Sequence, residues 1–277
     1  MPGVTLSPAH YGGLQFAADG LHAGAASLPS LCLFPAEIIR VIRRAAHVRV
    51  ILTVANTIPG SRVRVEMVKI SSESPEPSLI RYAADQIRAG EVLGMPTDTF
   101  YGLAADPFNL RAVERVYEIK SRSRHKPLSL LIEDVEQAEE LAKPLPEEFH
   151  ALAKKFWPGP LTIIVKAASR LPLKVTANTG NVALRVPNAQ IPLAVVKAAQ
   201  IPITATSANL SGATECVTAE AVRDQLGMRI PIIVDGGTSP RDIASTIVDL
   251  TDEDARWKIL REGAISSQEI SEFFAKG

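Results

Sequence analysis

A loop with the sequence KSRSRHK carries five basic side chains within seven residues, Lys120, Arg122, Arg124, His125 and Lys126. Arginine holds phosphate through a planar bidentate fork and lysine acts as a point charge, so this spacing suits a polyanion such as a nucleotide or an RNA backbone. The loop lacks the glycines of a Walker A motif, so a nucleotide would meet side chains here, not a nest of backbone amides. A solvated basic loop without a ligand has the same composition.

A second group of polar side chains follows the apolar run over 91–95, which we expect to be a buried strand. Pro96 ends backbone pairing because it has no amide hydrogen, and Thr97 to Thr99 then add two hydroxyls and a carboxylate. Gly102 permits a tight turn, after which we expect a helix. Ligands of open α/β sheets usually sit just past strand ends like this one, although an ordinary connection has the same features.

Further polar residues stand at other predicted strand ends. Ser207 and Asn209 follow one strand, Ser245 opens another, and Arg261 ends a third. These side chains could line a ligand or cap a turn through local hydrogen bonds. Arg185 lies inside the apolar strand sequence VALRV, and if it points into a cleft it needs an anionic partner.

The sequence after Met67 contains two histidines, His125 and His150, and no Ser/His/Asp set, metal-ligand spacing or Gly-rich dinucleotide motif. This composition disfavours hydrolases that use a histidine base. It leaves substrate positioning and electrostatic stabilisation as the expected mode of catalysis, with no protein-bound metal.

Alternating helical and strand patterns must position these groups. The apolar spacing predicts helices over 78–89, 110–119, 134–143, 146–157, 191–199, 218–226 and from 266 onward. Asn109, Thr218 and Ser266 are expected to cap three of them. Strands are predicted over 91–95, 128–132, 161–165, 182–186, 201–206, 230–234, 245–250 and 257–260. The order predicts an α/β domain with a twisted mixed sheet and flanking helices.

The charge and cysteine content of the chain limit its possible functions and its compartment. The 277 residues include 30 basic and 30 acidic side chains, so a role with nucleic acid must rest on a local patch, and nothing draws the chain to a membrane. Cys32 and Cys216 lie far apart without metal-ligand spacing, which indicates a reducing compartment. We expect a cytoplasmic protein.

Residues 1–66 differ from the rest, with six arginines, no lysine and three acidic residues. An upstream start, with Met67 as the natural first residue, is the favoured interpretation of this leader, and an organelle targeting segment is the second. Residues 67–277 are expected to form one catalytic domain.

Eight motifs stand in the order found in the Sua5/YrdC/YciO family, and they cover nearly all of the chain after Met67. They are PTDTFYGLAAD, KSRSRHKPLSLLI, WPGPLT, VALRVP, TSANLSG, IIVDGG, ASTIVDL and ILREG. The chain resembles the short, YrdC-type members that act as threonylcarbamoyl-AMP synthases. The resemblance implies a single YrdC-like domain around a concave basic cleft.

The resemblance also implies the reaction and its ligands. L-Threonine, bicarbonate and ATP would give threonylcarbamoyl-AMP and pyrophosphate for the t6A37 modification of tRNA, with Mg²⁺ bound mainly through ATP. No protein nucleophile is needed, because the carbamate of threonine can attack the α-phosphorus itself. Downstream threonylcarbamoyl-transferase proteins would take the product.

Site residues are implied position by position. The threonine contacts would be Thr99, Asn181, Arg185 and Ser245. The ATP contacts would be Lys120, Arg122, Lys126, Ser207, Asn209 and Arg261, with Lys120 and Arg122 as the catalytic residues. Three positions depart from the family pattern: Leu131 replaces a histidine of some members, Cys216 a serine, and Lys126 an asparagine of longer forms.

Two other functions fit the same residues. A YciO-like paralogue could use the pocket for another small molecule, and a module without catalytic activity could bind double-stranded RNA or tRNA through the basic loop. The presence of Thr99 and Arg185 favours a threonine site over the first alternative. Consumption of ATP that depends on threonine and bicarbonate would exclude the second.

Overall fold

The computed structural model describes residues 65–142, 144–252 and 255–275. Contacts divide the chain into 1–59 and 60–277, and all described residues belong to the second unit. Residues 1–64 of the leader therefore lie outside the described residues, and the two explanations of the leader remain predictions.

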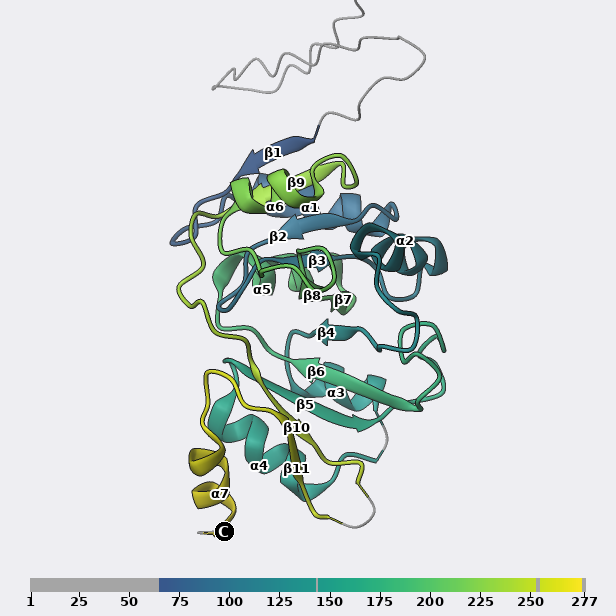
Figure 1. Cartoon of the computed structure of the whole chain (residues 1–277), viewed down its shortest axis with the longest axis vertical. Coiled ribbons are helices and arrows are strands. Elements are labelled where there is room, and N and C mark those ends of the chain that lie inside the picture. The colour runs from purple at the N-terminus through teal and green to yellow at the C-terminus, as the bar shows by residue number, and fades with distance from the viewer. Residues whose placement is uncertain (1–64, 143, 253–254, 276–277) are drawn as a thin grey trace, which may run out of the picture. The chain divides into compact units, whose positions relative to one another are not determined.

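The described chain is a mixed α/β structure (Figure 1). The helices are α1 (Pro77–Arg88), α2 (Leu110–Lys120), α3 (Val135–Leu141), α4 (Glu147–Phe156), α5 (Gln190–Ala199), α6 (Ala219–Leu226) and α7 (Ser267–Ala275). The strands are β1 (Glu66–Lys69), β2 (Leu93–Met95), β3 (Gly102–Ala104), β4 (Ser129–Leu131), β5 (Leu161–Lys166), β6 (Asn181–Arg185), β7 (Ile203–Thr204), β8 (Thr206–Ser207), β9 (Ile232–Asp235), β10 (Thr246–Asp249) and β11 (Lys258–Arg261).

The strands form two mixed sheets instead of the single sheet expected from the sequence. The first has the order β1-β9-β2-β3-β8 and the second the order β11-β10-β5-β6-β4-β7. Each contains both parallel and antiparallel pairs, for example β2 with β9 and β2 with β3 in the first sheet. The α/β class is confirmed, and the site can draw side chains from two sheets.

The chain passes from one sheet to the other at Ala205. The sequence predicted one strand over 201–206, but β7 pairs with β4 in the second sheet and β8 pairs with β3 in the first. Ala205 donates its amide to Ser129 O over 2.9 Å, so it closes the pairing on the second sheet just before β8 begins. Because of this switch, the polar end of β8 lies where residues of both sheets contribute to the site.

The segment after β2 differs from its prediction. We expected the polar turn to lead into a helix, but Gly102–Ala104 forms β3, which pairs antiparallel with β2. Gly102 is a strand residue paired with Ser207, not the pivot of a tight turn. The turn is held instead by Thr97, whose hydroxyl donates to Phe100 O over 2.7 Å and accepts from Thr99 N over 3.1 Å.

Three predicted helix caps are confirmed. Asn109 Oδ1 accepts from Arg111 N and Ala112 N at the start of α2, and Thr218 Oγ1 accepts from Ala221 N at the start of α6. Ser266 Oγ accepts from Glu269 N before α7. These short-range bonds satisfy amides that have no partner within the helix, which is why the sequence could predict them.

Helices cover the sheets through two apolar clusters (Figure 1). One contains Ile80 and Ile87 of α1, Val195 and Val196 of α5, and Leu93 of β2. The other joins buried residues of α2, α3, α4 and α6 to those of β5, β6 and β9. The helices and sheets thus bury most of the apolar side chains of the inner strands.

The expected boundary at Met67 falls inside a strand. β1 begins at Glu66, whose amide donates to Pro231 O over 2.7 Å, and runs parallel to β9. The Glu66 carboxylate also accepts from the Tyr82 hydroxyl over 2.8 Å. The folded unit thus uses at least one residue before Met67.

Candidate active site

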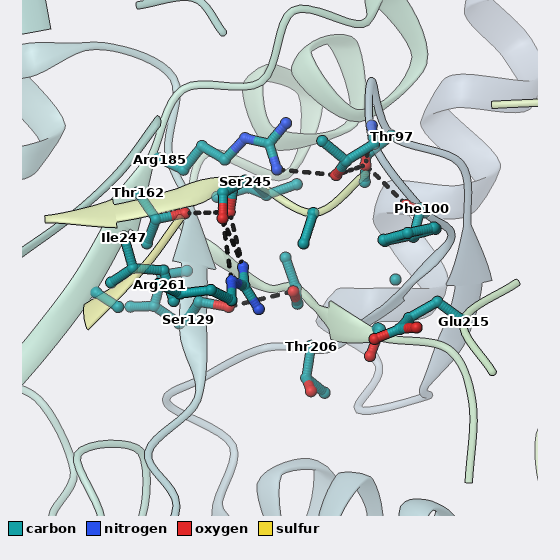
Figure 2. A pocket seen from close by; sticks show the side chains of 18 of the residues that line it. Thr97, Phe100, Ser129, Thr162, Arg185, Thr206, Glu215, Ser245, Ile247 and Arg261 are labelled. Carbon is teal, nitrogen blue, oxygen red and sulfur yellow. Dashed lines mark hydrogen bonds between the residues drawn. The ribbon is translucent and has the colours of Figure 1, made fainter. Parts of the chain in front are cut away.

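A pocket of about 380 Å³ lies where polar ends of both sheets meet. The cations Arg122, Lys126, Arg185 and Arg261 line it, together with one carboxylate, Glu215. Figure 2 shows Arg185 and Arg261 pointing into the pocket from one side and Glu215 from the other. A site with this excess of positive charge suits an anionic ligand.

Arg185 is buried at the end of β6 and is held by three separate bonds. Its Nη2 lies 2.6 Å from Oδ1 of Asp98, its Nη1 donates to Thr99 Oγ1 over 3.0 Å, and its Nε donates to Gly159 O over 2.9 Å. Burial lowers the pKa of Arg185, which the charge of Asp98 opposes. Asp98 is therefore the anionic partner that an arginine in this apolar strand requires.

Gly159 shapes the turn that holds Arg185. A Cβ atom on Gly159 would lie 2.3 Å from Phe156 O, closer than any real contact, so only glycine fits. The Gly159 amide donates to Val186 O over 2.9 Å while its carbonyl accepts from Arg185. The WPGP turn thus holds the guanidinium of Arg185 through the carbonyl of Gly159.

The turn after β2 contributes Thr97 and Thr99 to the lining of the pocket, and Figure 2 shows Thr97 at its edge. Both residues are buried, and their hydroxyl oxygens lie 3.1 Å apart. Tyr101 attaches the turn to the segment after β9, since its hydroxyl donates to Gly237 O over 2.6 Å. These bonds hold the end of the pocket that Thr97 and Thr99 line in one arrangement.

The basic loop divides its side chains between the pocket and the surface. Arg122 and Lys126 line the pocket, and Arg122 Nη2 donates to Pro127 O over 2.9 Å. Arg124 pairs with Glu114 of α2 and is not among the lining residues. The loop starts at Ser121, which has a φ of 51° and turns the chain at the end of α2. Two of the five predicted basic side chains thus reach the pocket.

Lys120 is buried beneath the pocket and does not line it. Its Nζ donates to Ser207 O, to Asn209 O over 2.8 Å and to Asn209 Oδ1 over 2.9 Å. Burial, assisted by the charge of Arg122, lowers the pKa of Lys120 to about 8. All three ammonium protons therefore bond to the turn after β8, so this lysine orders the turn in the structure observed.

The turn after β8 is a connected network. Ser207 lines the pocket, and its hydroxyl donates to Asn209 Oδ1 over 2.7 Å. Asn209 is buried, and its Nδ2 donates to Ala213 O over 2.5 Å. Ser207 is thus in a position to meet a ligand directly, and Asn209 supports it.

Ser245 and Arg261 form the third polar corner. Arg261 Nη2 donates to Ser245 O over 2.8 Å and to Ser245 Oγ over 3.2 Å, and Ser245 Oγ lies 2.8 Å from Thr162 Oγ1 (Figure 2). Gly263 makes this packing possible, because a Cβ there would lie 2.2 Å from Ala244 O. Thr162, on β5, is a lining residue that the sequence did not single out.

Asn181 is a predicted threonine contact that does not line the pocket. It stands at the opposite end of β6 from Arg185, about 13 Å away for an extended strand. Its Nδ2 donates to Thr251 Oγ1 over 3.0 Å. Three strand residues lie between Asn181 and Arg185, and a threonine contact at Asn181 stays a prediction.

Glu215 and Asp98 are functional candidates that sequence reasoning missed. Glu215 lines the pocket and has no hydrogen bond or ion pair with any other described residue. Asp98 was noted only as part of a polar turn. An acidic residue between two threonines just after a strand was the available signal for Asp98, but its burial could not be read from the sequence.

Two kinds of feature are absent from the described ranges. No three His, Cys, Asp or Glu side chains there stand together as a possible metal site. No helix of residues 65–142, 144–252 and 255–275 has both the length and the apolar character needed to cross a membrane.

Related proteins are similar in sequence and structure to most of the described chain. A threonylcarbamoyl-AMP synthase from Pyrococcus abyssi is 39% identical over 193 residues, which cover 69% of this chain and 56% of the relative. The crystal structure of P. abyssi Sua5 complexed with L-threonine matches with a TM-score of 0.72 and 37% identity, covering 75% of this chain and 60% of that one. The crystal structure of E. coli YciO matches with a TM-score of 0.67 and 26% identity, covering 72% and 96%.

The chain thus spans little more than half the length of the P. abyssi proteins that it resembles. The family model Sua5_yciO_yrdC, described as telomere recombination, matches residues 85–263, which include every residue that lines the pocket. This range is more than half of the chain. The protein belongs to the Sua5/YciO/YrdC family.

Proposed function

We propose that this chain is an L-threonylcarbamoyladenylate synthase, a nucleotidyltransferase that converts L-threonine, bicarbonate and ATP into threonylcarbamoyl-AMP and pyrophosphate. The observation that carries the proposal is the placement of Arg185 and Thr99 in one pocket with Arg122, Lys126 and Arg261. One end can anchor an amino acid and the rest can hold phosphates. The name of the P. abyssi relative and the threonine bound to P. abyssi Sua5 support the same reaction.

The amino acid binds at the Thr99 and Arg185 end. Arg185 uses one proton on each of Nη1 and Nη2 for Thr99 and Asp98, which leaves one proton on each nitrogen for a substrate carboxylate. The hydroxyls of Thr97, Thr99 and Ser245 are close enough to the pocket to meet the ammonium or hydroxyl group of threonine. A site that hydrogen-bonds a hydroxyl strongly disfavours an analogue without it.

The phosphates bind at the basic end. Arg122 and Lys126 approach from the basic loop and Arg261 from the end of β11, so cations surround the place where pyrophosphate leaves. Arg122 is the catalytic residue in this proposal, because a fixed guanidinium stabilises charge that develops in the transition state. Lys120 assists by holding Ser207 and Asn209, which makes it a positioning residue in the structure observed.

The chemistry requires no protein nucleophile. The threonine amine and bicarbonate form a carbamate with loss of water, and a carbamate oxygen then displaces pyrophosphate from the α-phosphorus. Mg²⁺ carried by ATP would offset phosphate charge, and Glu215 is the pocket carboxylate that could contribute an oxygen ligand. The protein supplies orientation and positive charge.

The proposal extends to the place of the reaction in the cell. The product would serve the t6A37 modification of tRNA through downstream threonylcarbamoyl-transferase proteins, in the cytoplasm. The unstable mixed anhydride makes direct delivery to such a protein chemically sensible.

The deciding experiment incubates the full chain with ATP, labelled bicarbonate and L-threonine and separates the labelled adenylate. We expect labelled threonylcarbamoyl-AMP and equal pyrophosphate, with L-valine reacting far more slowly and L-serine between them. Equal pyrophosphate release with all three amino acids would contradict a threonine-specific pocket.

A YciO-like function is the second candidate, because the match to E. coli YciO covers 96% of that protein. If no adenylate forms, while the chain still binds ATP and another small molecule, this alternative is favoured. Binding of tRNA or double-stranded RNA without any ATP consumption would instead indicate a module without catalytic activity.

A further inference from the structure

The carboxylate of Asp98 has one satisfied oxygen and one unsatisfied oxygen. Oδ1 binds Arg185, whereas Oδ2 is buried without a hydrogen-bond partner. Nη1 of Arg241 lies 4.0 Å from Oδ2. Within the described residues, Arg241 makes no hydrogen bond, and its side chain is 43% exposed. A buried oxygen and an uncommitted guanidinium thus face each other just beyond bonding distance.

Arg241 belongs to the segment 236–245 that joins β9 to β10 and ends at the pocket. Ala244 and Ser245, a few residues further on, line the pocket itself. The other buried side-chain oxygen without a partner in the described residues is Ser239 Oγ, two residues before Arg241. One unsatisfied oxygen therefore lies within this segment, and the other lies 4.0 Å from its Arg241.

The charges at this end of the pocket show what Arg241 could add. Arg185 lies 2.6 Å from Asp98, so the two side chains form a nearly neutral pair. A substrate carboxylate next to this pair would be attracted by Arg185 and repelled by Asp98 almost equally. With Arg241 beside Oδ2, the three side chains carry a net charge of about +1, which matches a single carboxylate.

We propose that Arg241 is a specificity-determining positioning residue, which pairs with Asp98 Oδ2 and so frees the charge of Arg185 for the carboxylate of the amino acid. This inference rests on the proposed function, in which Arg185 receives that carboxylate. Shortening the contact from 4.0 Å to an ordinary charged hydrogen bond of about 2.8 Å requires a shift of little more than 1 Å. Gly237, with a φ of 82°, stands at the start of the segment.

The test compares L-threonine with L-threoninamide, which keeps the side chain and the ammonium group but lacks the negative charge. Binding of each to the full chain is measured by titration calorimetry for the wild type, Arg241→Ala and Arg241→Lys. Arg223→Ala serves as a matched control, because it also removes one arginine, with a side chain 46% exposed, from a helix that does not line the pocket.

We expect Arg241→Ala to weaken threonine binding about fivefold to tenfold, since the lost charge is partly screened by solvent. Threoninamide binding should stay within twofold of wild type or become slightly tighter. Arg241→Lys should restore part of the loss, because it keeps the charge without the planar fork. The control should bind both ligands like the wild type.

Two results would overturn the inference alone: unchanged threonine binding in Arg241→Ala, or equal weakening for threonine and threoninamide, which a merely structural role would produce. A wild-type chain that binds no threonine would overturn the proposed function and this inference together. Unfolding curves for each variant identify any loss of folded protein.

Discussion

The guanidinium of Arg185 and the carboxylate of Asp98 form a buried ion pair that joins the two sheets of the protein. Arg185 ends β6 in the second sheet and Asp98 follows β2 in the first, and their Nη2 and Oδ1 atoms lie 2.6 Å apart. The pair stands beside the pocket, so it bears on both stability and ligand binding.

Replacing Asp98 with asparagine should destabilise the fold. The change keeps the shape of the side chain but leaves the buried charge of Arg185 without its partner, a loss that costs about 3 kcal/mol or more. The free energy of unfolding in urea measures it. Asp224→Asn is the control, because Asp224 pairs with Arg223 on the surface and should cost less than about 1 kcal/mol. Equal losses for both variants would contradict the structural role given to Asp98.

The two arginines of the basic loop should behave differently. Arg122 lines the pocket, whereas Arg124 pairs with Glu114 outside it. Arg122→Ala should lower kcat about a hundredfold, as for loss of one fixed charge-stabilising donor, and Arg122→Lys should recover part of it. Arg124→Ala should leave kcat within about twofold. Steady-state kinetics with threonine and ATP varied separately give kcat for each variant. Near-wild-type turnover of Arg122→Ala would show that the loop takes no part in the reaction.

Lys120 should make stability depend on pH in the alkaline range. Burial lowers its pKa to about 8 from an ordinary value of 10.5, so between these values the unfolded chain binds a proton that the folded chain has released. The free energy of unfolding should therefore rise with pH from about 8 to 10.5, relative to Lys120→Met, by at most about 1.4 kcal/mol per unit. Urea unfolding at several pH values measures the difference, and identical profiles for both proteins would show that this pKa is not lowered.

The position of the first strand predicts the effect of shortening the leader. A chain beginning at Met67 lacks Glu66, and with it the hydrogen bonds to Pro231 O and from Tyr82. It should be less stable than a chain beginning at Gly60 by about 1–3 kcal/mol, while turnover at low temperature stays the same. Thermal unfolding and the adenylate assay on both chains test this. Equal melting temperatures would show that the residues before Met67 do not stabilise the fold.

Local features were predictable because they depend on residues close in sequence. The caps at Asn109, Thr218 and Ser266 involve amides within three residues, and the apolar spacing of α1 and α2 records the face that each helix buries. The strand at 201–206 was predicted as one element because nothing local reveals that Ala205 separates two sheets. β3 was missed for a related reason, since three residues after a polar turn carry too little periodicity.

The sequence by itself determined the family, the polar strand ends and the basic loop, because each is written in neighbouring residues. Only the tertiary structure decided which of those groups meet: Arg185 finds Asp98 across 87 residues, Lys120 turns inward to Asn209 across 89, and Asn181 stays at the far end of its strand. Such contacts depend on how strands pair and how two sheets pack. That arrangement minimises the free energy of the whole chain, and no short segment specifies it.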